Sequence, residues 1–160
     1  MFKVGDLAVY PAHGVGTIHS IEKRETSGGT MMFYIIKIIN TGATIILPTG
    51  NIESVGLRKI VDKNALQKVY QILRGKKDPV IYNQTWNRRH REYMDKIKSG
   101  SVREVARVMR ELHLLKSNKE LSFGEKKMLD MAKNLLIREL AITKNITEDK
   151  MEAKLNKIMQ

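Results

Sequence analysis

The sequence contains no cysteine and no long hydrophobic run. Without thiols, disulfide bonds, thiolate zinc sites and thiol catalysis are excluded. No stretch approaches the ~20 consecutive apolar residues that span a bilayer. The first residues, MFKVGDLAVYP, also lack the apolar core of a signal peptide. We therefore expect a cytoplasmic protein with no membrane partner.

Motifs for catalysis and cofactor binding are also scarce. The Gly-x-Ser-x-Gly motif of a serine nucleophile is absent. Gly14 and Gly16 begin a dinucleotide fingerprint, but its third glycine would fall at His19. Metal-ligand spacing with carboxylates is not seen at any of His13, His19, His90 and His113. We expect no enzymatic activity, no cofactor, no metal and no small-molecule substrate.

What the sequence does contain is an excess of positive charge. Lysine and arginine outnumber aspartate and glutamate by 29 to 17, which gives a net charge of +12. Residues 1–60 carry only +2 of this and residues 61–160 carry +10. Such a charge favours a polyanionic partner, either nucleic acid or an anionic membrane surface. The second part of the chain should carry that surface.

Residues 1–59 show the pattern of a small β domain. Turn-forming residues recur about every ten positions, and β-branched and aromatic runs lie between them. Short strands at this spacing predict a small barrel rather than an open sheet. The run MMFYIIKII (31–39) is apolar on both faces. Its second face should cover a neighbouring element, the helical part of the chain or a partner.

Residues 60–160 show helical periodicity instead. Helices are predicted to begin near residue 62, Thr85, Ser101, Ser122 and Thr147. Ser101–Glu104 and Ser122–Glu125 have the spacing of capping boxes. The predicted fold class is α+β with two domains, a small β-barrel at residues 1–59 and an all-α helical bundle at residues 60–160.

The only tryptophan, Trp86, lies in the basic segment NQTWNRRHRE (83–92). On a helix it shares a stripe with Tyr93 and Ile97, so the indole could simply begin the buried face. Thr85, however, has the character of an N-cap, which leaves Trp86 half-buried in the first turn. A helix N-terminus favours phosphate, and an apolar ring among arginines suits a wedge in the minor groove. The candidate DNA-binding residues are Trp86, Arg88, Arg89 and Arg91.

A second basic stripe lies on the predicted helix that follows, opposite its apolar face. It consists of Arg103, Arg107 and Arg110. The stripe is either a solvated face with ion pairs along the helix or a further surface for a polyanion. Diffuse phosphate contacts are the most that we expect of Lys76, Lys77, Lys96 and Lys98.

Six segments together resemble the CarD/CdnL family of bacterial transcription regulators. In chain order they are FKVGDLAVYPAHGVGTI, IEKRE, VGLRKIV, WNRRHRE, IKSGS and LSFGEKKML. The resemblance runs from Phe2 to about Ala141, with the order and spacing of the family. No single segment is decisive, but the set is highly specific.

The resemblance implies a Tudor-like, SH3-like barrel, related to the polymerase-interacting module of the transcription-repair coupling factor, that docks on the RNA polymerase β subunit. It implies a helical domain at the upstream edge of the transcription bubble. There the family's tryptophan wedges into the minor groove and stabilises the open promoter complex. Trp86 matches that tryptophan, and Arg88, Arg89 and Arg91 match its basic companions. The implied location is the bacterial nucleoid.

The resemblance also implies polymerase contacts on the barrel. Arg24, in IEKRE, matches the first of two arginines that some members carry. The second arginine would fall two residues before Pro48, where this sequence has Ile46. The expected polymerase-binding residues are therefore Arg24 and Ile46, with an apolar contact at the second position.

We thus expect a regulator that docks on the polymerase β subunit and contacts promoter DNA without sequence specificity. One alternative is a stand-alone repressor or architectural DNA-binding protein. Another is a protein-interaction adaptor without DNA contact, in which Trp86 is buried. RNA binding is less favoured, because the helical part lacks an aromatic stacking platform.

Overall fold

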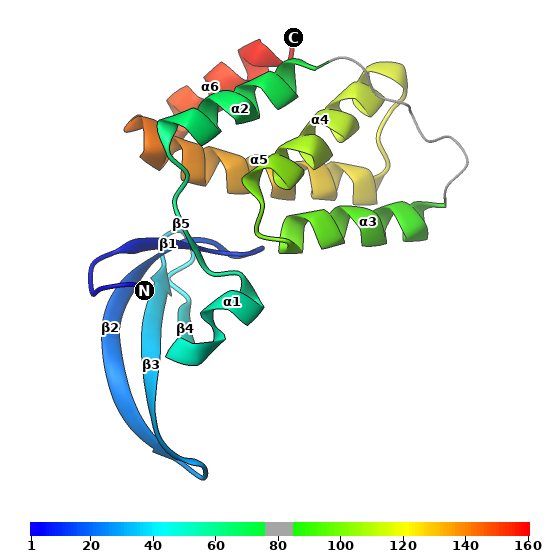
Figure 1. Cartoon of the computed structure of the whole chain (residues 1–160). Coiled ribbons are helices and arrows are strands. Elements are labelled where there is room, and N and C mark those ends of the chain that lie inside the picture. The colour runs from blue at the N-terminus through cyan, green and yellow to red at the C-terminus, as the bar shows by residue number, and fades with distance from the viewer. Residues whose placement is uncertain (76–84) are drawn as a thin grey trace. The chain divides into compact units, whose positions relative to one another are not determined.

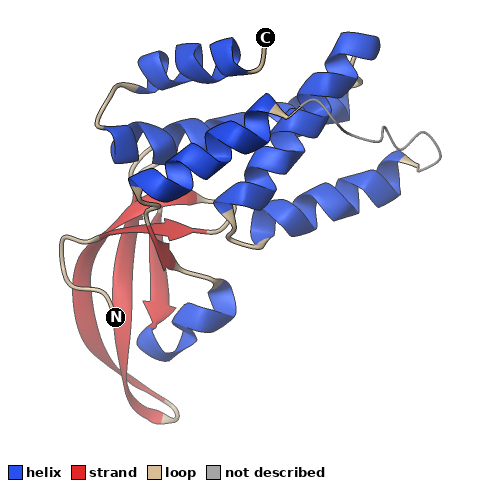
Figure 2. Cartoon of the chain, turned by 45° about the horizontal axis from the view of Figure 1, so that its top comes forward, coloured by secondary structure: helices blue, strands red, loops and turns tan. Residues whose placement is uncertain are grey.

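The structure, a computed structural model, describes residues 1–75 and 85–160. The predicted connection at 76–84, with Lys76 and Lys77, lies outside the described residues. The chain divides into two compact units, Met1–Ile60 and Val61–Gln160 (Figure 1). The first, the β unit, contains all the described strands, and the second, the helical unit, contains the long helices (Figure 2). The α+β fold class is therefore confirmed.

The β unit is a five-stranded antiparallel sheet in the order β4-β3-β2-β1-β5. Its strands are β1 (Leu7–Tyr10), β2 (Gly14–Thr26), β3 (Gly29–Ile38), β4 (Thr44–Pro48) and β5 (Arg58–Lys59). A tight turn joins β2 to β3, and Gly29 follows it with a φ of 109°, a backbone conformation that glycine adopts at little cost. The turn predicted at 27–29 is thus confirmed.

One face of this sheet carries the core of the β unit. Tyr34, Ile36 and Ile38 alternate along β3 and are all buried. A Cβ on Gly16 would lie 2.7 Å from the Ile36 side chain, so glycine lets β2 and β3 pack closely there. The buried cluster comprises Phe2, Ala8, Ile18, Tyr34, Ile36, Ile38, Leu47 and Leu57.

A short helical segment interrupts the pattern that predicted only strands and turns before residue 60. The 3₁₀ helix η1 (Thr49–Asn51) runs directly into α1 (Ile52–Val55). Gly56 ends α1 with a φ of 75°, and its N–H donates to the carbonyl of Ile52. The predicted turn at 48–51 is therefore the start of a helical turn, which returns the chain to the sheet edge at β5.

The helical unit comprises α2 (Lys63–Arg74), α3 (Trp86–Lys98), α4 (Val102–Asn118), α5 (Phe123–Lys144) and α6 (Glu148–Ile158). Helix α4 lies at its centre and packs against α2, α3 and α5, while α6 packs against α2 and α5. The apolar stripe of α4 is buried as predicted and consists of Val102, Val105, Val108, Met109, Leu112 and Leu115. Among the described residues, no helix is both long and apolar enough to cross a membrane.

The predicted helix starts are confirmed, but one of the two capping boxes is incomplete. At α5, the Ser122 hydroxyl accepts from the Glu125 N–H and the Glu125 carboxylate accepts from the Ser122 N–H. At α4, Ser101 caps the helix, yet its own N–H donates to Ser99 Oγ at 3.2 Å. The box predicted at Ser101–Glu104 is thus wrong in its second half, because Ser99 supplies the acceptor and Glu104 pairs with Arg107.

Candidate nucleic-acid interface

Trp86 occupies the first position of α3. The Thr85 hydroxyl caps the helix by accepting a hydrogen bond from the Arg88 N–H at 3.4 Å. The indole is half-buried, and its ring centroid lies 5.5 Å from that of His90 and 6.3 Å from that of Tyr93. Tyr93 is buried, so the indole borders the core without entering it. The adaptor alternative predicts a fully buried Trp86, and the indole is only partly buried.

The three arginines that follow the indole differ in direction. Arg88 and Arg91 are exposed, and Arg88 makes only a loose ion pair with Glu92, at 3.7 Å. An exposed pair of this kind contributes little to stability and leaves the guanidinium available to other anions. Arg88 and Arg91 therefore present positive charge to solvent near the N-terminus of α3, where the helix dipole adds to it.

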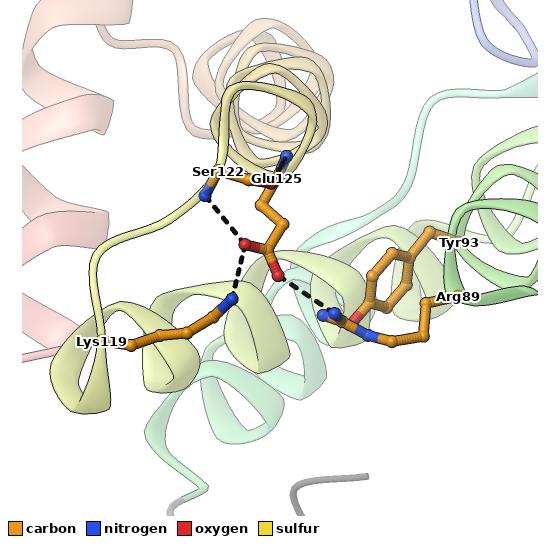
Figure 3. Close-up of polar contacts among 5 residues, drawn as sticks. All are labelled: Arg89, Tyr93, Lys119, Ser122 and Glu125. Carbon is orange, nitrogen blue, oxygen red and sulfur yellow. Dashed lines mark hydrogen bonds and ion pairs between the residues drawn. The ribbon is translucent and has the colours of Figure 1, made fainter. Parts of the chain in front are cut away.

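Arg89 turns inward. Its Nη1 lies 3.0 Å from Glu125 Oε2, and its Nη2 donates to Tyr93 Oη at 3.3 Å (Figure 3). Its Cζ also lies 5.4 Å from the Trp86 ring centroid, within range of a cation–π interaction. Arg89 stays a predicted DNA contact, but its guanidinium is already engaged within the helical unit.

Burial and hydrogen bonding change the pKa of two groups in this cluster. It raises the pKa of Tyr93 to about 12, against the opposing hydrogen bond from Arg89. Burial would also raise the pKa of Glu125, but hydrogen bonds from Ser122, Lys119 and Arg89 outweigh it and lower this pKa to about 2. Glu125 is therefore an anion at any physiological pH, and Tyr93 is neutral.

Phe123 is a candidate that the sequence reasoning missed. Its side chain is 82% exposed, whereas no other phenylalanine, tyrosine or tryptophan among the described residues is classed as exposed. Phe123 directly follows the N-cap Ser122, just as Trp86 directly follows the N-cap Thr85. An aromatic residue at the first position of a helix was thus a usable signal. Phe123 also precedes Gly124, the residue against which the Trp86 indole lies.

The second basic stripe divides as well. Arg103 and Arg107 line a shallow groove of about 340 Å³ with Lys68 of α2. Arg110 instead donates from Nη1 to the carbonyl of Ile72 at 3.2 Å, near the end of α2. The stripe is therefore neither wholly solvated nor wholly available to a polyanion, because one of its members caps a neighbouring helix.

The β unit carries the second predicted surface. Arg24 pairs with Met31 across β2 and β3, and Ile46 pairs with Ile35 across β3 and β4. Residues paired across strands share a face, and alternation along β3 places Phe33 between Met31 and Ile35 on it. We call Arg24, Met31, Phe33 and Ile46 the outer sheet face, because it lies opposite the core of the β unit.

The outer sheet face is apolar with a charged margin. Met31 is 41% exposed and Ile46 47% exposed. Arg24 Nη2 lies 2.9 Å from Glu22 Oε2, and both side chains are about half exposed. From strand geometry, Arg24 and Ile46 are roughly 16 Å apart, which one protein partner of ordinary interface size spans.

Metal binding has no support within the described parts of the chain. There, no three histidine, cysteine, aspartate or glutamate side chains are placed to hold an ion together. The charged groups near Trp86 are mainly cationic, which suits an anionic ligand instead.

Two known domain families match the chain. The CarD-like/TRCF RID domain matches residues 2–61, and the CarD C-terminal domain matches residues 68–156. The "Putative transcription factor YdeB" of Bacillus subtilis (strain 168) is 38% identical over 154 residues, which are 96% of this chain and 99% of the relative.

Two solved structures from Myxococcus xanthus also show similarity. The solution NMR structure of the 72-residue N-terminal domain of CarD is 32% identical, with a TM-score of 0.33, and the match covers 37% of this chain and 79% of that one. The CdnLNt structure is 43% identical, with a TM-score of 0.34, and its match covers 39% of this chain and 89% of that one.

Proposed function

The chain belongs to the CarD/CdnL family of bacterial transcription regulators, and from this premise we propose that it docks on the RNA polymerase β subunit and stabilises the open promoter complex. As a member, it regulates transcription through an interaction with RNA polymerase. The β subunit as the docking partner, and promoter DNA as the target of the helical unit, are the proposed parts.

The outer sheet face is the proposed docking surface. Its exposed Met31 and Ile46 offer apolar area that a partner can cover, while Arg24 offers a charge at the margin. Interfaces combine an apolar centre with a polar rim in this way. The apolar second face of the run at 31–39 then has a use as a partner surface.

The proposed DNA contact rests on one observation above all, the half-buried indole at the N-terminus of α3 beside two outward arginines. Opening a base step in the minor groove costs a few kcal/mol of stacking. Trp86 supplies an apolar plate that replaces part of the lost stacking. Arg88 and Arg91 hold the flanking phosphates and fix the position of the helix without reading bases.

Docking and wedging act together. Binding of the β unit to polymerase raises the effective concentration of the helical unit at the promoter, so the DNA contact itself can be weak. The indole fits melted DNA better than closed duplex. This difference in affinity shifts the equilibrium toward the open complex.

Capture of polymerase followed by promoter melting tests this function. The tagged chain should retain RNA polymerase from a bacterial lysate and bind an isolated β-subunit fragment. With purified polymerase, it should increase the permanganate reactivity of unpaired promoter thymines. Tight binding to one operator without polymerase would instead support the stand-alone repressor, and capture without any change in melting would support the adaptor.

A further inference from the structure

The first turn of α5 forms a seat for the indole. An added Cβ on Gly124 would lie 2.9 Å from Trp86 Nε1 and 3.1 Å from its Cε2 and Cζ2. These are atoms of a rigid ring, so such a clash is relieved only if the whole indole or the backbone at Gly124 moves. The indole therefore lies directly against Gly124, where any larger residue displaces it.

The next residue, Glu125, joins the same turn to α3. Its side chain is 2% exposed and accepts hydrogen bonds on both carboxylate oxygens (Figure 3). Lys119 Nζ and the Ser122 N–H each donate to Oε1 at 2.9 Å. Arg89 Nη1 donates to Oε2 at 3.0 Å. One oxygen thus accepts hydrogen bonds from the N-cap of α5 and the loop before it, while the other accepts a hydrogen bond from α3.

Arg89 carries this link to the indole. Its guanidinium carbon lies 5.4 Å from the Trp86 ring centroid and 5.6 Å from the Tyr93 ring centroid. Its Nη2 donates to Tyr93 Oη at 3.3 Å, which fixes the plane of the guanidinium. The cation therefore pairs with the buried carboxylate and also lies within cation–π range of the indole.

Breaking the Arg89–Glu125 ion pair costs free energy, so the pair can hold a neighbouring side chain in place. The arginine is 15% exposed and its carboxylate partner is nearly inaccessible. Removal of Arg89 leaves Glu125 Oε2 without its partner, and the buried carboxylate then depends on the half-exposed Lys119 for compensation of its charge. The low pKa of Glu125 means that the link persists throughout the physiological pH range.

We propose that the first turn of α5 positions the Trp86 wedge, with Gly124 as its seat and Glu125 as its clamp through Arg89. The inference rests on the proposed function, since it states how the same indole is held ready for DNA. A ring fixed before binding loses less conformational entropy when it enters the groove. Arg89 is then a positioning residue, and phosphate contacts fall to Arg88 and Arg91.

The Gly124→Ala variant tests the seat. Alanine is compatible with a helix, so α5 should stay folded while the new methyl group clashes with the indole. Trp86 is the only tryptophan, so one indole N–H signal in a ¹H–¹⁵N spectrum and one fluorescence emission report its position. We expect a shifted signal and stronger acrylamide quenching. The matched control is Gly50→Ala, whose Cβ meets nothing within 4 Å and which should change neither reading.

The Glu125→Gln variant tests the clamp, because it keeps the size of the side chain but removes its charge. We expect the same two changes in the indole. Ser122→Ala removes the hydroxyl that caps α5 yet leaves the Arg89–Glu125 pair. It should lower stability without moving the indole signal. Arg89→Lys, which keeps the charge, should retain more of the wild-type signal than Arg89→Met.

The outcomes separate the positioning role from the proposed function. Wild-type indole signals in both Gly124→Ala and Glu125→Gln would overturn the positioning role, whatever these variants do in transcription. Shifted indole signals in these variants, together with promoter opening that falls toward the Trp86→Ala level, support the positioning role. If the signals move but Trp86→Ala opens promoters as well as the wild type, the positioning role stands and the proposed function fails.

Discussion

At the residue scale, the basic side chains around Trp86 lie in two different environments. Arg88 and Arg91 are exposed, and Arg88 is paired only loosely with Glu92, whereas Arg89 is held by Glu125 and Tyr93. The sequence shows these arginines as one run, because nothing in their spacing reveals a carboxylate that lies 36 positions further along the chain. Only packing separates the two exposed arginines, for which we propose phosphate contacts, from the engaged Arg89.

Mutation of the two kinds of arginine should affect different properties. Loss of an exposed arginine should change the salt dependence of DNA binding, whereas loss of Arg89 should change the stability of the fold. For Arg88→Ala or Arg91→Ala we expect the slope of log affinity for promoter DNA against log salt to fall by about 1, the effect of one lost phosphate contact. For Arg89→Ala we expect an unfolding free energy lower by about 3 kcal/mol, because the buried Glu125 carboxylate then keeps only the half-exposed Lys119 as a cationic partner. Salt titrations and urea unfolding check both results. Equal slopes in Arg88→Ala and wild type would remove Arg88 from the DNA contact.

Glu125 should also give the protein a distinct dependence on pH. Its pKa falls from 4.5 to about 2 on folding. This difference contributes about 3 kcal/mol of stability, fully present above pH 4.5 and lost as the pH falls toward 2. We expect the unfolding free energies of wild type and Glu125→Gln to converge over that range in urea unfolding. A difference between them that stays constant from pH 7 to pH 3 would contradict the assignment.

At the element scale, local signals predicted most of the helical unit. Thr85, Ser101, Ser122 and Thr147 are all observed N-caps, because capping depends on residues three positions apart. The short helix α1 was missed because four residues carry no periodicity. The Gly124 seat was missed for a different reason, since it exists only where α3 meets α5.

The two predicted capping boxes should respond differently to mutation. Loss of either serine hydroxyl, in Ser101→Ala or Ser122→Ala, should cost about 1 kcal/mol of stability. Glu104→Ala should change it by less than about 0.5 kcal/mol, because Glu104 is half-exposed and does not cap α4. Thermal unfolding of the three variants checks this, and a Glu104→Ala loss as large as that of Ser101→Ala would restore the complete box.

The outer sheet face should govern affinity for polymerase. Arg24→Glu and Ile46→Asp should each weaken binding to an isolated β-subunit fragment, because one reverses the marginal charge and the other buries a carboxylate in the apolar centre. Lys63→Glu, on the exposed first turn of α2, makes the same charge change in the helical unit and serves as the control. Binding measured by calorimetry should be unchanged in that control. If all three variants bind alike, the docking surface lies elsewhere on the β unit.

At the scale of the whole molecule, the uneven charge agrees with the roles that we propose for the two units. The β unit is nearly neutral, with +2 over residues 1–60, and the remainder carries +10. A protein-docking unit needs no large net charge, whereas a unit that contacts phosphate gains from one. The sequence predicted this contrast because charge is additive along the chain. The residues that fix the indole could not be predicted in the same way.

A variant that weakens recruitment and a variant that removes the wedge should also depend differently on protein concentration. Arg24→Glu should open promoters poorly at low protein concentration and recover as the concentration rises, because only its local enrichment is weakened. Trp86→Ala should not recover at any concentration, because the step that favours melted DNA is lost. Titration of both variants in a promoter-melting assay checks this. Parallel curves for the two would mean that the units do not have separate roles.

The lifetime of the open complex at saturating protein tests the role of the indole most directly. Polymerase and promoter are first allowed to form open complexes with wild type or with Trp86→Ala, and a competitor then traps the polymerase that dissociates. We predict a long lifetime with wild type and, with Trp86→Ala, a lifetime close to that of polymerase alone despite unchanged binding to the β subunit. Equal lifetimes with wild type and Trp86→Ala would contradict the wedge.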